Sequence, residues 1–353
     1  MPLQYLDNVV VKGIAACIPK NKVSNLDYTL LSLEERKKFI KTTGIEFRHI
    51  AEAEQCTSDF CYFAAKSLID ELKWNKDEID ILLFVSQTAD YPYPATSIIL
   101  QDRLGISKSC IAFDINLGCS GYVYGLGVIS SMISSMKMKK GLLLVGETAS
   151  KTTTISDKSA YPLFGDAGTA TALEFTEEFG RMYFNFGCDG SGYKAILMKS
   201  GNIGGRFPVT VESLRLKKVC DGIERNDSHV ALEGIDIFNF SIHEVPNTIR
   251  MVIENNNINI NDIDAFILHQ ANFIINDTVR KKLKISEEKV PYTLKEFGNT
   301  SSASIPLTIV NKLRNRVIND KIKLLLCGFG VGLSWGAIVL DLEKIICPDL
   351  IEI

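Results

Sequence analysis

The sequence predicts an α/β protein made of a duplicated unit of parallel strands and crossover helices. The two halves of its 353 residues repeat the same order of apolar segments and turns. Residues 142–146 and 324–328 are matching apolar segments that end in glycine, and residues 79–80 and 263–264 are Ile-Asp pairs that precede a strand. Because these strands are apolar almost throughout, we expect helices on both faces of each sheet.

The first half alternates short apolar runs with polar, helix-like segments. Its predicted strands are residues 9–17, 79–86, 110–113, 142–145 and one that ends near Phe175. One helix is expected over residues 32–41, and a second from a cap at Ser58 or Asp59 to about Trp74. The strand at 110–113 is expected to be buried. The run from Tyr122 carries no charge until Lys137 and predicts a buried helix.

The second half follows the same plan. A long helix is expected over residues 234–255, with a kink or break at Pro246. A strand over residues 264–268 follows, and then a helix that contains Arg280. Gly298 is expected to open another helix, and the closing strands are predicted at 324–328 and 336–342. We place the boundary between the two halves so that they span residues 1–176 and 177–353.

Composition excludes several classes of protein. A net charge of −3 without a basic run gives no indication of a nucleic-acid-binding surface. Nine cysteines, an odd number with no two-residue spacing, argue against both a disulfide framework and a zinc site, so no metal is expected. The uncharged stretch at residues 324–340 is shorter than the ~20 residues of a membrane span. Because Asp7 interrupts the start, no signal peptide is expected either, and we predict a cytoplasmic protein.

Cys119 lies where a predicted strand turns sharply into a predicted helix. Free backbone amides and the helix dipole at such a turn stabilise a thiolate. Gly118 and Gly121 would let a substrate approach the backbone closely. The alternative is that Cys119 is a small buried hydrophobic residue, as most cysteines are. If the two halves are related by a pseudo-twofold axis, the ends of equivalent helices meet, which would bring Cys119 close to Asn299.

Four segments of the sequence together resemble the ketoacyl-ACP synthase III family of thiolase-fold condensing enzymes, and the resemblance also extends to residues 43–49. These segments are residues 117–121, 268–272, 298–303 and 328–336. The resemblance implies a thiolase-like fold in which duplicated βαβ halves form αβαβα layers. The N-terminal half would carry the nucleophilic cysteine, and the C-terminal half the histidine and asparagine.

The resemblance also implies a reaction and a division of labour. Cys119 would accept an acyl group from acyl-CoA and hold it as a thioester. His269 and Asn299 would donate hydrogen bonds to the carbonyl of a malonyl thioester, supplied by malonyl-acyl carrier protein. Loss of CO2 would then give an enolate that attacks the acyl group and forms a β-ketoacyl thioester. The backbone amides of Cys119 and Val331 would form the oxyanion hole, and no cofactor would be required.

The individual residues have simpler interpretations as well. His269 could be a core histidine at the end of a strand, and Asn299 could only cap its helix. The segment 164–168 is interpreted as a structural turn beside the site rather than as a phosphate-binding loop.

Several positions depart from the pattern of the family. A tryptophan and an arginine that hold the CoA adenine are replaced by Lys38 and Thr42, and their partner arginine by Lys158. Ile274 replaces an arginine that contacts the carrier protein, and Val331 replaces a glycine. The sequence therefore does not identify the acyl donor or the docking partner. The departures favour a specialised pathway over housekeeping fatty-acid initiation.

Tyr93 lies where the family places an aromatic residue that reaches into the acyl tunnel of a second subunit. A homodimer and a restricted acyl chain follow as expectations.

Other activities compete with condensation. An acyltransferase of the same fold would pass the acyl group from Cys119 to an alcohol or amine without decarboxylation. Thiolase and hydroxymethylglutaryl-CoA synthase need an additional cysteine or glutamate base, for which no motif is present. A papain-like hydrolase would carry its cysteine in a different sequence context. A non-catalytic subunit is disfavoured because the nucleophile is present.

Overall fold

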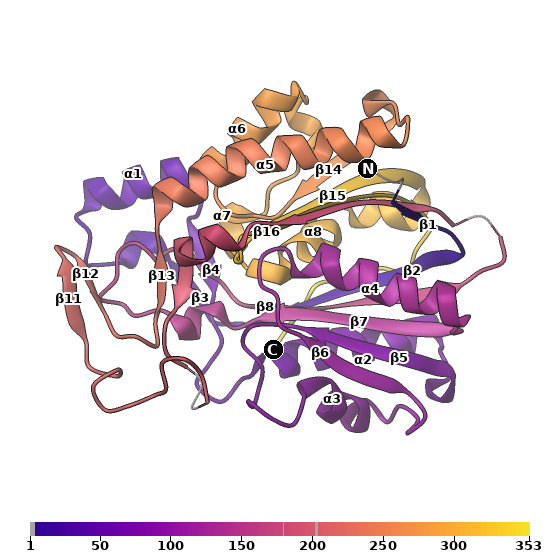
Figure 1. Ribbon diagram of the computed structural model, residues 1–353, viewed down its shortest axis with the longest axis horizontal. Helices are drawn as coiled ribbons and strands as arrows, with labels where there is room; N and C mark the ends of the chain where they lie inside the picture. The colour runs from indigo at the N-terminus through magenta and orange to yellow at the C-terminus, as the bar shows by residue number, and fades with distance from the viewer. Residues whose placement is uncertain (1–3, 179, 202–203) are drawn as a thin grey trace.

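The computed structural model describes residues 4–178, 180–201 and 204–353, and these residues form five layers (Figure 1). Helices and sheets alternate through the molecule, which confirms the predicted αβαβα arrangement. The helical layers, from bottom to top in Figure 1, are α2 (Thr57–Leu72) with α3 (Thr96–Leu104), α4 (Gly121–Met136) with α8 (Ser304–Asn319), and α5 (Gly234–Asn255) with α6 (Phe273–Leu283).

The first sheet has the strand order β17-β2-β8-β7-β5-β6. Its strands are β17 (Ile351–Glu352), β2 (Val9–Ile18), β8 (Ala167–Phe175), β7 (Lys140–Glu147), β5 (Ile79–Val85) and β6 (Ile111–Ile115). Pairing is parallel from β7 through β5 to β6, whereas β8 runs antiparallel to both of its neighbours. The strands predicted for the first half, including the one that ends near Phe175, are thus present, and they form a mixed sheet.

The second sheet repeats this order as β1-β9-β16-β15-β14. Its strands are β1 (Tyr5–Leu6), β9 (Met182–Cys188), β16 (Ser334–Glu343), β15 (Lys321–Gly330) and β14 (Ala265–Leu268). The succession β9-β16-β15-β14 corresponds to β2-β8-β7-β5, as a duplicated unit requires. The terminal strands cross over, because β1 joins the second sheet and β17 the first. The boundary between residues 176 and 177 stays a prediction.

The expectation of parallel strands is only partly right. β15 and β16 are antiparallel, since a turn over residues 331–333 joins them directly. A parallel pair would need a crossover connection of a dozen or more residues.

Helices α4 and α8 form the central layer and pack on both sheets. Leu126 and Ile129 of α4 and Ile305 and Leu313 of α8 belong to one buried cluster with residues of β5 and β15. This position explains why the segment from Tyr122 carries no charge. The N-terminal ends of the two helices converge at the same place, beside one cavity.

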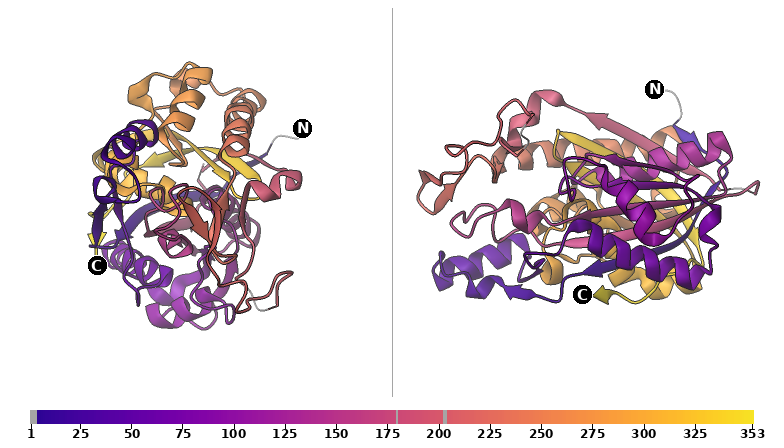
Figure 2. Two further views of the ribbon diagram at one scale, coloured as in Figure 1. Left: turned by 90° about the vertical axis from the view of Figure 1, so that its left-hand side faces the viewer. Right: turned by 90° about the horizontal axis from the view of Figure 1, so that it is seen from below.

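The smaller elements gather mainly at one end of the molecule. Helix α1 and the β11–β12 hairpin lie at the left-hand end in Figure 1 and in the right-hand view of Figure 2. These elements are α1 (Leu33–Thr43), α7 (Leu294–Phe297), β3 (Lys22–Ser24) with β4 (Phe47–His49), β10 (Ile196–Met198) with β13 (Val230–Leu232), and β11 (Lys217–Cys220) with β12 (Ile223–Arg225). Across the described ranges, no helix has the length and apolar character needed to cross a membrane.

One predicted helix cap differs from the structure. The N-cap of α2 is Cys56 and not Ser58 or Asp59, and the helix begins at Thr57. Asp59 instead occupies the third helical position, and its carboxylate accepts the backbone N–H of Cys56 at 2.8 Å. The acidic residue therefore reaches back to the start of the helix without being its first residue.

Helix α5 continues through Pro246, so the break that was one of the two expectations does not occur, and the kink stays a prediction. A proline inside a helix leaves the carbonyl four residues earlier without its usual donor. Here that carbonyl belongs to Ile242, and the ammonium of Lys282 donates to it at 3.0 Å. A tertiary contact from α6 thus replaces the missing hydrogen bond.

Two further expectations need correction. β6 is an edge strand that is half-buried, with Ile111 37% exposed, so the apolar run before Asp114 is not a buried strand. The helix expected to open at Gly298 starts with a single 3-10 turn at Ser301–Ala303, and α8 itself begins at Ser304.

Candidate active site

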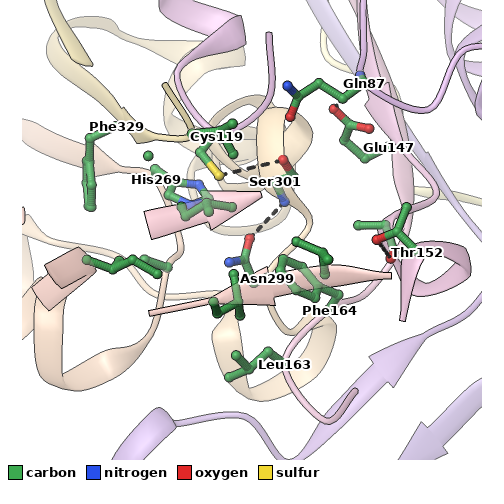
Figure 3. A pocket seen from close by; sticks show the side chains of 18 of the residues that line it. Gln87, Cys119, Glu147, Thr152, Leu163, Phe164, His269, Asn299, Ser301 and Phe329 are labelled. Atoms are coloured by element: carbon green, nitrogen blue, oxygen red, sulfur yellow. Dashed lines mark hydrogen bonds between the residues drawn. The ribbon is translucent and has the colours of Figure 1, made fainter. Parts of the chain in front are cut away.

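A cavity of about 480 Å³ lies between the two halves, beside the converging ends of α4 and α8 (Figure 3). The side chains of Cys119, His269 and Asn299 all line it, and so does Val331. The prediction that Cys119 and Asn299 come together across the pseudo-twofold axis is therefore confirmed. Three residues from distant parts of the sequence thus line one cavity.

Cys119 comes two residues before the first residue of α4 and is 8% exposed. Its Sγ lies 3.7 Å from the Oγ of Ser301. The end of β15 passes so close that a Cβ at Gly330, where φ is +153°, would lie 2.6 Å from the Cβ of Cys119. Only glycine allows this approach, which brings the following amide of Val331 to the thiol.

Burial raises the pKa of the Cys119 thiol. The Ser301 hydroxyl and the backbone amides of Val331 and of Cys119 itself act in the opposite direction and stabilise the anion. The amides at the turn therefore favour the thiolate, as expected, but loss of water outweighs them and the pKa of the resting thiol lies above its usual value. The same three donors would become effective when negative charge develops at this point during a reaction.

Asn299 is held from both sides by the backbone. Its N–H donates to the carbonyl of Leu163 at 2.9 Å, and its carbonyl accepts the N–H of Gly165 at 3.1 Å. Its side-chain Oδ1 accepts the N–H of Ser301 at 2.9 Å (Figure 3). Because that partner can only donate, the oxygen must face it and the Nδ2 donors remain for the cavity. Asn299 thus caps the turn, as the simpler interpretation proposed, and still presents a donor.

His269 is 1% exposed at the end of β14. Its Nδ1 lies 2.8 Å from the Oγ of Ser304, which also accepts the N–H of Gln270 at 3.3 Å. Burial lowers the pKa of His269 to about 3, with the Ser301 backbone acting in the opposite direction. The ring is therefore neutral. When the Ser304 hydroxyl donates to Nδ1, the proton of the ring lies on Nε2, and His269 is a hydrogen-bond donor at that atom.

The turn at 164–168 lies beside the site, as predicted. Phe164 forms a β-bridge with Asn299 and lines the cavity. The buried Arg48 guanidinium donates to the carbonyls of Tyr161 and Phe164 at 2.8 and 3.1 Å. Arg48, part of the segment 43–49, therefore supports the turn against which Asn299 is held.

Glu147 lines the cavity and was missed by sequence reasoning. Its carboxylate accepts from the hydroxyls of Ser86, Thr88 and Ser302 at 3.2, 2.7 and 3.4 Å, and from the N–H of Gln87 at 3.0 Å. Burial raises its pKa to about 7, against the effect of these bonds. The signal was available, since an acidic residue ends an otherwise apolar strand at the cavity.

The five residues predicted to bind the substrate or a second subunit are not among those that line the cavity. Lys38 and Thr42 are exposed on α1, and Lys158 is half-buried next to Ser159, a lining residue. Ile274 is 45% exposed on α6, and Tyr93 is 86% exposed. Their roles stay predictions. No group of three or more metal-binding side chains occurs in the described parts of the chain.

Comparison with known proteins agrees with this geometry. Two family models match, 3-oxoacyl-[acyl-carrier-protein (ACP)] synthase III over residues 113–190 and its C-terminal part over residues 253–342. The β-ketoacyl-[acyl-carrier-protein] synthase III of Staphylococcus epidermidis is 34% identical over 339 residues, which cover 96% of this chain and 100% of that protein. The chain belongs to the β-ketoacyl-[acyl-carrier-protein] synthase III family.

Solved structures of this family support the assignment. The 3-oxoacyl-(acyl-carrier protein) synthase of Burkholderia xenovorans is 33% identical, with a TM-score of 0.91 and coverage of 99% of each chain. The enzyme of Pseudomonas aeruginosa is 28% identical, with a TM-score of 0.83 and coverage of 96% of this chain and 99% of that chain. The chain therefore has the thiolase-like fold of a β-ketoacyl-ACP synthase III and is an acyltransferase of the decarboxylative condensing type. Nothing in these comparisons favours the non-decarboxylating alternative.

Proposed function

We propose that Cys119, His269 and Asn299 divide the condensation between them, with Cys119 holding the acyl group and the other two activating the malonyl thioester. One observation carries this proposal. The thiol of Cys119, the neutral ring of His269 and the carboxamide of Asn299 line the same cavity, and the ring and the carboxamide can each donate a hydrogen bond.

In the first step, the sulfur of Cys119 attacks the carbonyl of an acyl-CoA thioester. The backbone amides of Cys119 and Val331 would stabilise the tetrahedral oxyanion, since both act on the buried sulfur in the resting enzyme. The C–S bond to CoA breaks, and the proton lost by Cys119 leaves with the CoA thiol. The product is an acyl-enzyme.

In the second step, a malonyl thioester carried by acyl carrier protein enters beside His269 and Asn299. Its carboxylate leaves as CO2, and the electron pair moves into an enolate whose oxygen accepts hydrogen bonds from both donors. Neutral donors suit this role, because neither has to lose a proton to stabilise the charge. The enolate carbon then attacks the acyl group, and Cys119 leaves as a thiolate that regains a proton.

Roles for the predicted binding residues outside the cavity are proposed from their places in the sequence pattern of the family. Lys38, Thr42 and Lys158 would lie along the CoA or carrier arm, and Ile274 would contact the carrier protein. No step in this scheme uses a metal or an organic cofactor. Residues 1–176 and 177–353 would each supply one half of the site.

A homodimer is proposed from the exposed apolar residues around the β6 edge. Tyr93 is 86% exposed, and Ile111 of β6 and Met136 of α4 are 37% and 57% exposed. A second copy would cover this edge, and Tyr93 would reach its acyl tunnel. The nine unpaired cysteines are in keeping with a cytoplasmic location.

The deciding experiment incubates the enzyme with an acyl-CoA and carboxyl-labelled malonyl-acyl carrier protein. We expect labelled CO2 and a β-ketoacyl product, together with an acyl adduct seen by intact mass. Cys119→Ala should abolish the adduct, whereas Cys220→Ala, at an exposed cysteine outside the cavity, should keep it. An adduct that persists in Cys119→Ala, or the absence of CO2 release in the wild type, would contradict the proposal.

A further inference from the structure

Arg48 is a buried cation that the proposed mechanism does not use. It is 1% exposed and lies on β4, outside the residues that line the cavity. Its Nε donates to the Oδ1 of Asn25 at 3.1 Å, and its Nη1 donates to the carbonyls of Tyr161 and Phe164 at 2.8 and 3.1 Å. One planar guanidinium thus joins three uncharged oxygens, so its position and theirs depend on each other.

The segment that Arg48 contacts, residues 161–164, lies outside the strands of the two sheets, yet each of its four carbonyls accepts a hydrogen bond. Arg48 donates to the first and the last of them. Asn25, which is 2% exposed, donates to the carbonyl of Pro162 at 2.9 Å. The N–H of Asn299 donates to the carbonyl of the next residue, also at 2.9 Å. Two buried side chains and Asn299 therefore set the course of this segment.

Arg48 also packs against the backbone that leads into Asn299. Gly298 has a φ of +66°, and a Cβ at this position would lie 2.9 Å from the Cγ of Arg48. A residue with a side chain could not allow the stem of Arg48 to come so near. Arg48 thus contacts both the segment that holds Asn299 and the residue that precedes Asn299.

These contacts bear on the enolate step because of how Asn299 is held. Its backbone N–H and carbonyl are bonded to residues 163 and 165, so a shift of that segment moves the carboxamide as well. A donor acts on a developing negative charge only from the correct position, and a misplacement of about 1 Å can slow a reaction by about 10²-fold. The amides proposed to bind the acyl oxyanion belong to Cys119 and Val331, which lie outside this segment. Acylation should therefore depend on Arg48 much less.

We infer that Arg48, together with Asn25, is a positioning residue that holds Asn299 where it can donate to the enolate. This inference rests on the proposed function, which gives Asn299 that role. It also assigns a task to residues 43–49, which belong to the family resemblance but do not line the cavity.

The test uses Arg48→Lys in the full-length protein. Lysine keeps the positive charge, but its single ammonium cannot reproduce the planar set of donors. We expect single-turnover release of labelled CO2 from malonyl-acyl carrier protein, started from the acyl-enzyme, to fall by about 10- to 100-fold. Acylation of Cys119 by an acyl-CoA should stay within about threefold of the wild-type rate. Arg181→Lys, at an arginine paired with Asp7 outside the cavity, should change neither step.

A double-mutant cycle separates positioning from a general loss of structure. If Arg48 acts through Asn299, Arg48→Lys should cause no further loss of CO2 release in an Asn299→Ala background. A structural defect would lower the rate again in that background. Asn25→Ala is the second variant should Arg48→Lys not fold. It removes the bonds to Pro162 and Arg48, and we expect a loss of CO2 release of about three- to tenfold with acylation preserved.

Two kinds of failure are distinguishable. Equal losses in both steps, or losses that multiply in the cycle, would overturn the inference and leave the proposed function intact. CO2 release at the wild-type rate in Arg48→Lys, or in Asn25→Ala should the former not fold, would overturn it as well. Release of CO2 at the wild-type rate by Asn299→Ala would instead reject the proposed function, and the inference with it.

Discussion

The Sγ of Cys119 lies 3.7 Å from the Oγ of Ser301, a residue 182 positions further along the chain. Ser301 has a φ of +47°, in the left-handed region that residues other than glycine seldom adopt. The side chain of Asn299 holds the N–H of Ser301 in this conformation. The residue proposed to activate the malonyl thioester therefore also positions the hydroxyl beside the Cys119 thiol, and a change at Asn299 is transmitted to the surroundings of the thiol.

Removal of the Ser301 hydroxyl should make Cys119 less acidic. In Ser301→Ala the thiol loses a donor that lowers its pKa, so burial acts with less opposition. We expect the pH at which iodoacetamide alkylates Cys119 at half its maximal rate to rise, and alkylation at pH 7.5 to slow by about three- to tenfold. The measurement is the pH profile of modification, followed by mass. Ser135→Ala, on the exposed part of α4, serves as control. An unchanged profile would show that the contact does not influence the thiol.

Loss of the Ser304 hydroxyl should impair decarboxylation more than acylation. Without a donor to Nδ1, His269 can place its proton on that atom, and Nε2 then ceases to be a donor. For Ser304→Ala we expect CO2 release to fall by about 10- to 100-fold, while acyl-enzyme forms at a rate close to that of the wild type. Nitrogen-15 NMR of the His269 ring would report the change of tautomer directly. Ser130→Ala removes a buried serine elsewhere and should change neither step. Equal losses in both steps would mean that Ser304 is only structural.

Asn299→Asp should separate the two steps in the same way by a different mechanism. A carboxylate cannot donate to the enolate when ionised, and its charge opposes the developing negative charge. We expect condensation to fall by about 10²- to 10³-fold with little loss of acylation. Rates of CO2 release and of acyl-enzyme formation are compared with those of Asn315→Asp, an exposed position on α8. Condensation within a few-fold of the wild-type rate would remove Asn299 from its proposed role.

Glu147 should make the stability of the protein depend on pH. Burial raises its pKa from the usual 4.5 to about 7 in the folded state, so between these values the folded state binds more protons than the unfolded state. This contribution is therefore complete below about pH 4.5 and is lost as pH rises through 7, by an amount on the order of 3 kcal/mol. Glu147→Gln should remove this loss. Urea unfolding of both proteins at pH 5 and pH 8 measures the difference.

The control for that comparison is Glu343→Gln, at a glutamate that is 67% exposed. Its stability should follow the wild type at both pH values. If wild type and Glu147→Gln change in parallel between pH 5 and pH 8, Glu147 is ionised throughout this range and its hydrogen bonds outweigh its burial.

Local sequence patterns predicted much of the fold. The bounds of α5 agree with the prediction at both ends, because the pattern of apolar residues repeats at helical spacing over residues 234–255. The failures involve contacts that are distant in sequence. Lys282 supports the carbonyl freed by Pro246, and no local pattern contains that information.

The sequence by itself determined the family and the α/β duplication and predicted the three residues proposed to react, since each of these depends on residue types in a local order. The tertiary structure decided the protonation states and the surroundings of those residues. Cys119 rests as a thiol and His269 as a neutral ring because both are buried, and burial depends on how the two halves pack. The position of Ser304 beside His269, and of Arg48 beside the turn that holds Asn299, likewise arises only when separate strands and helices meet.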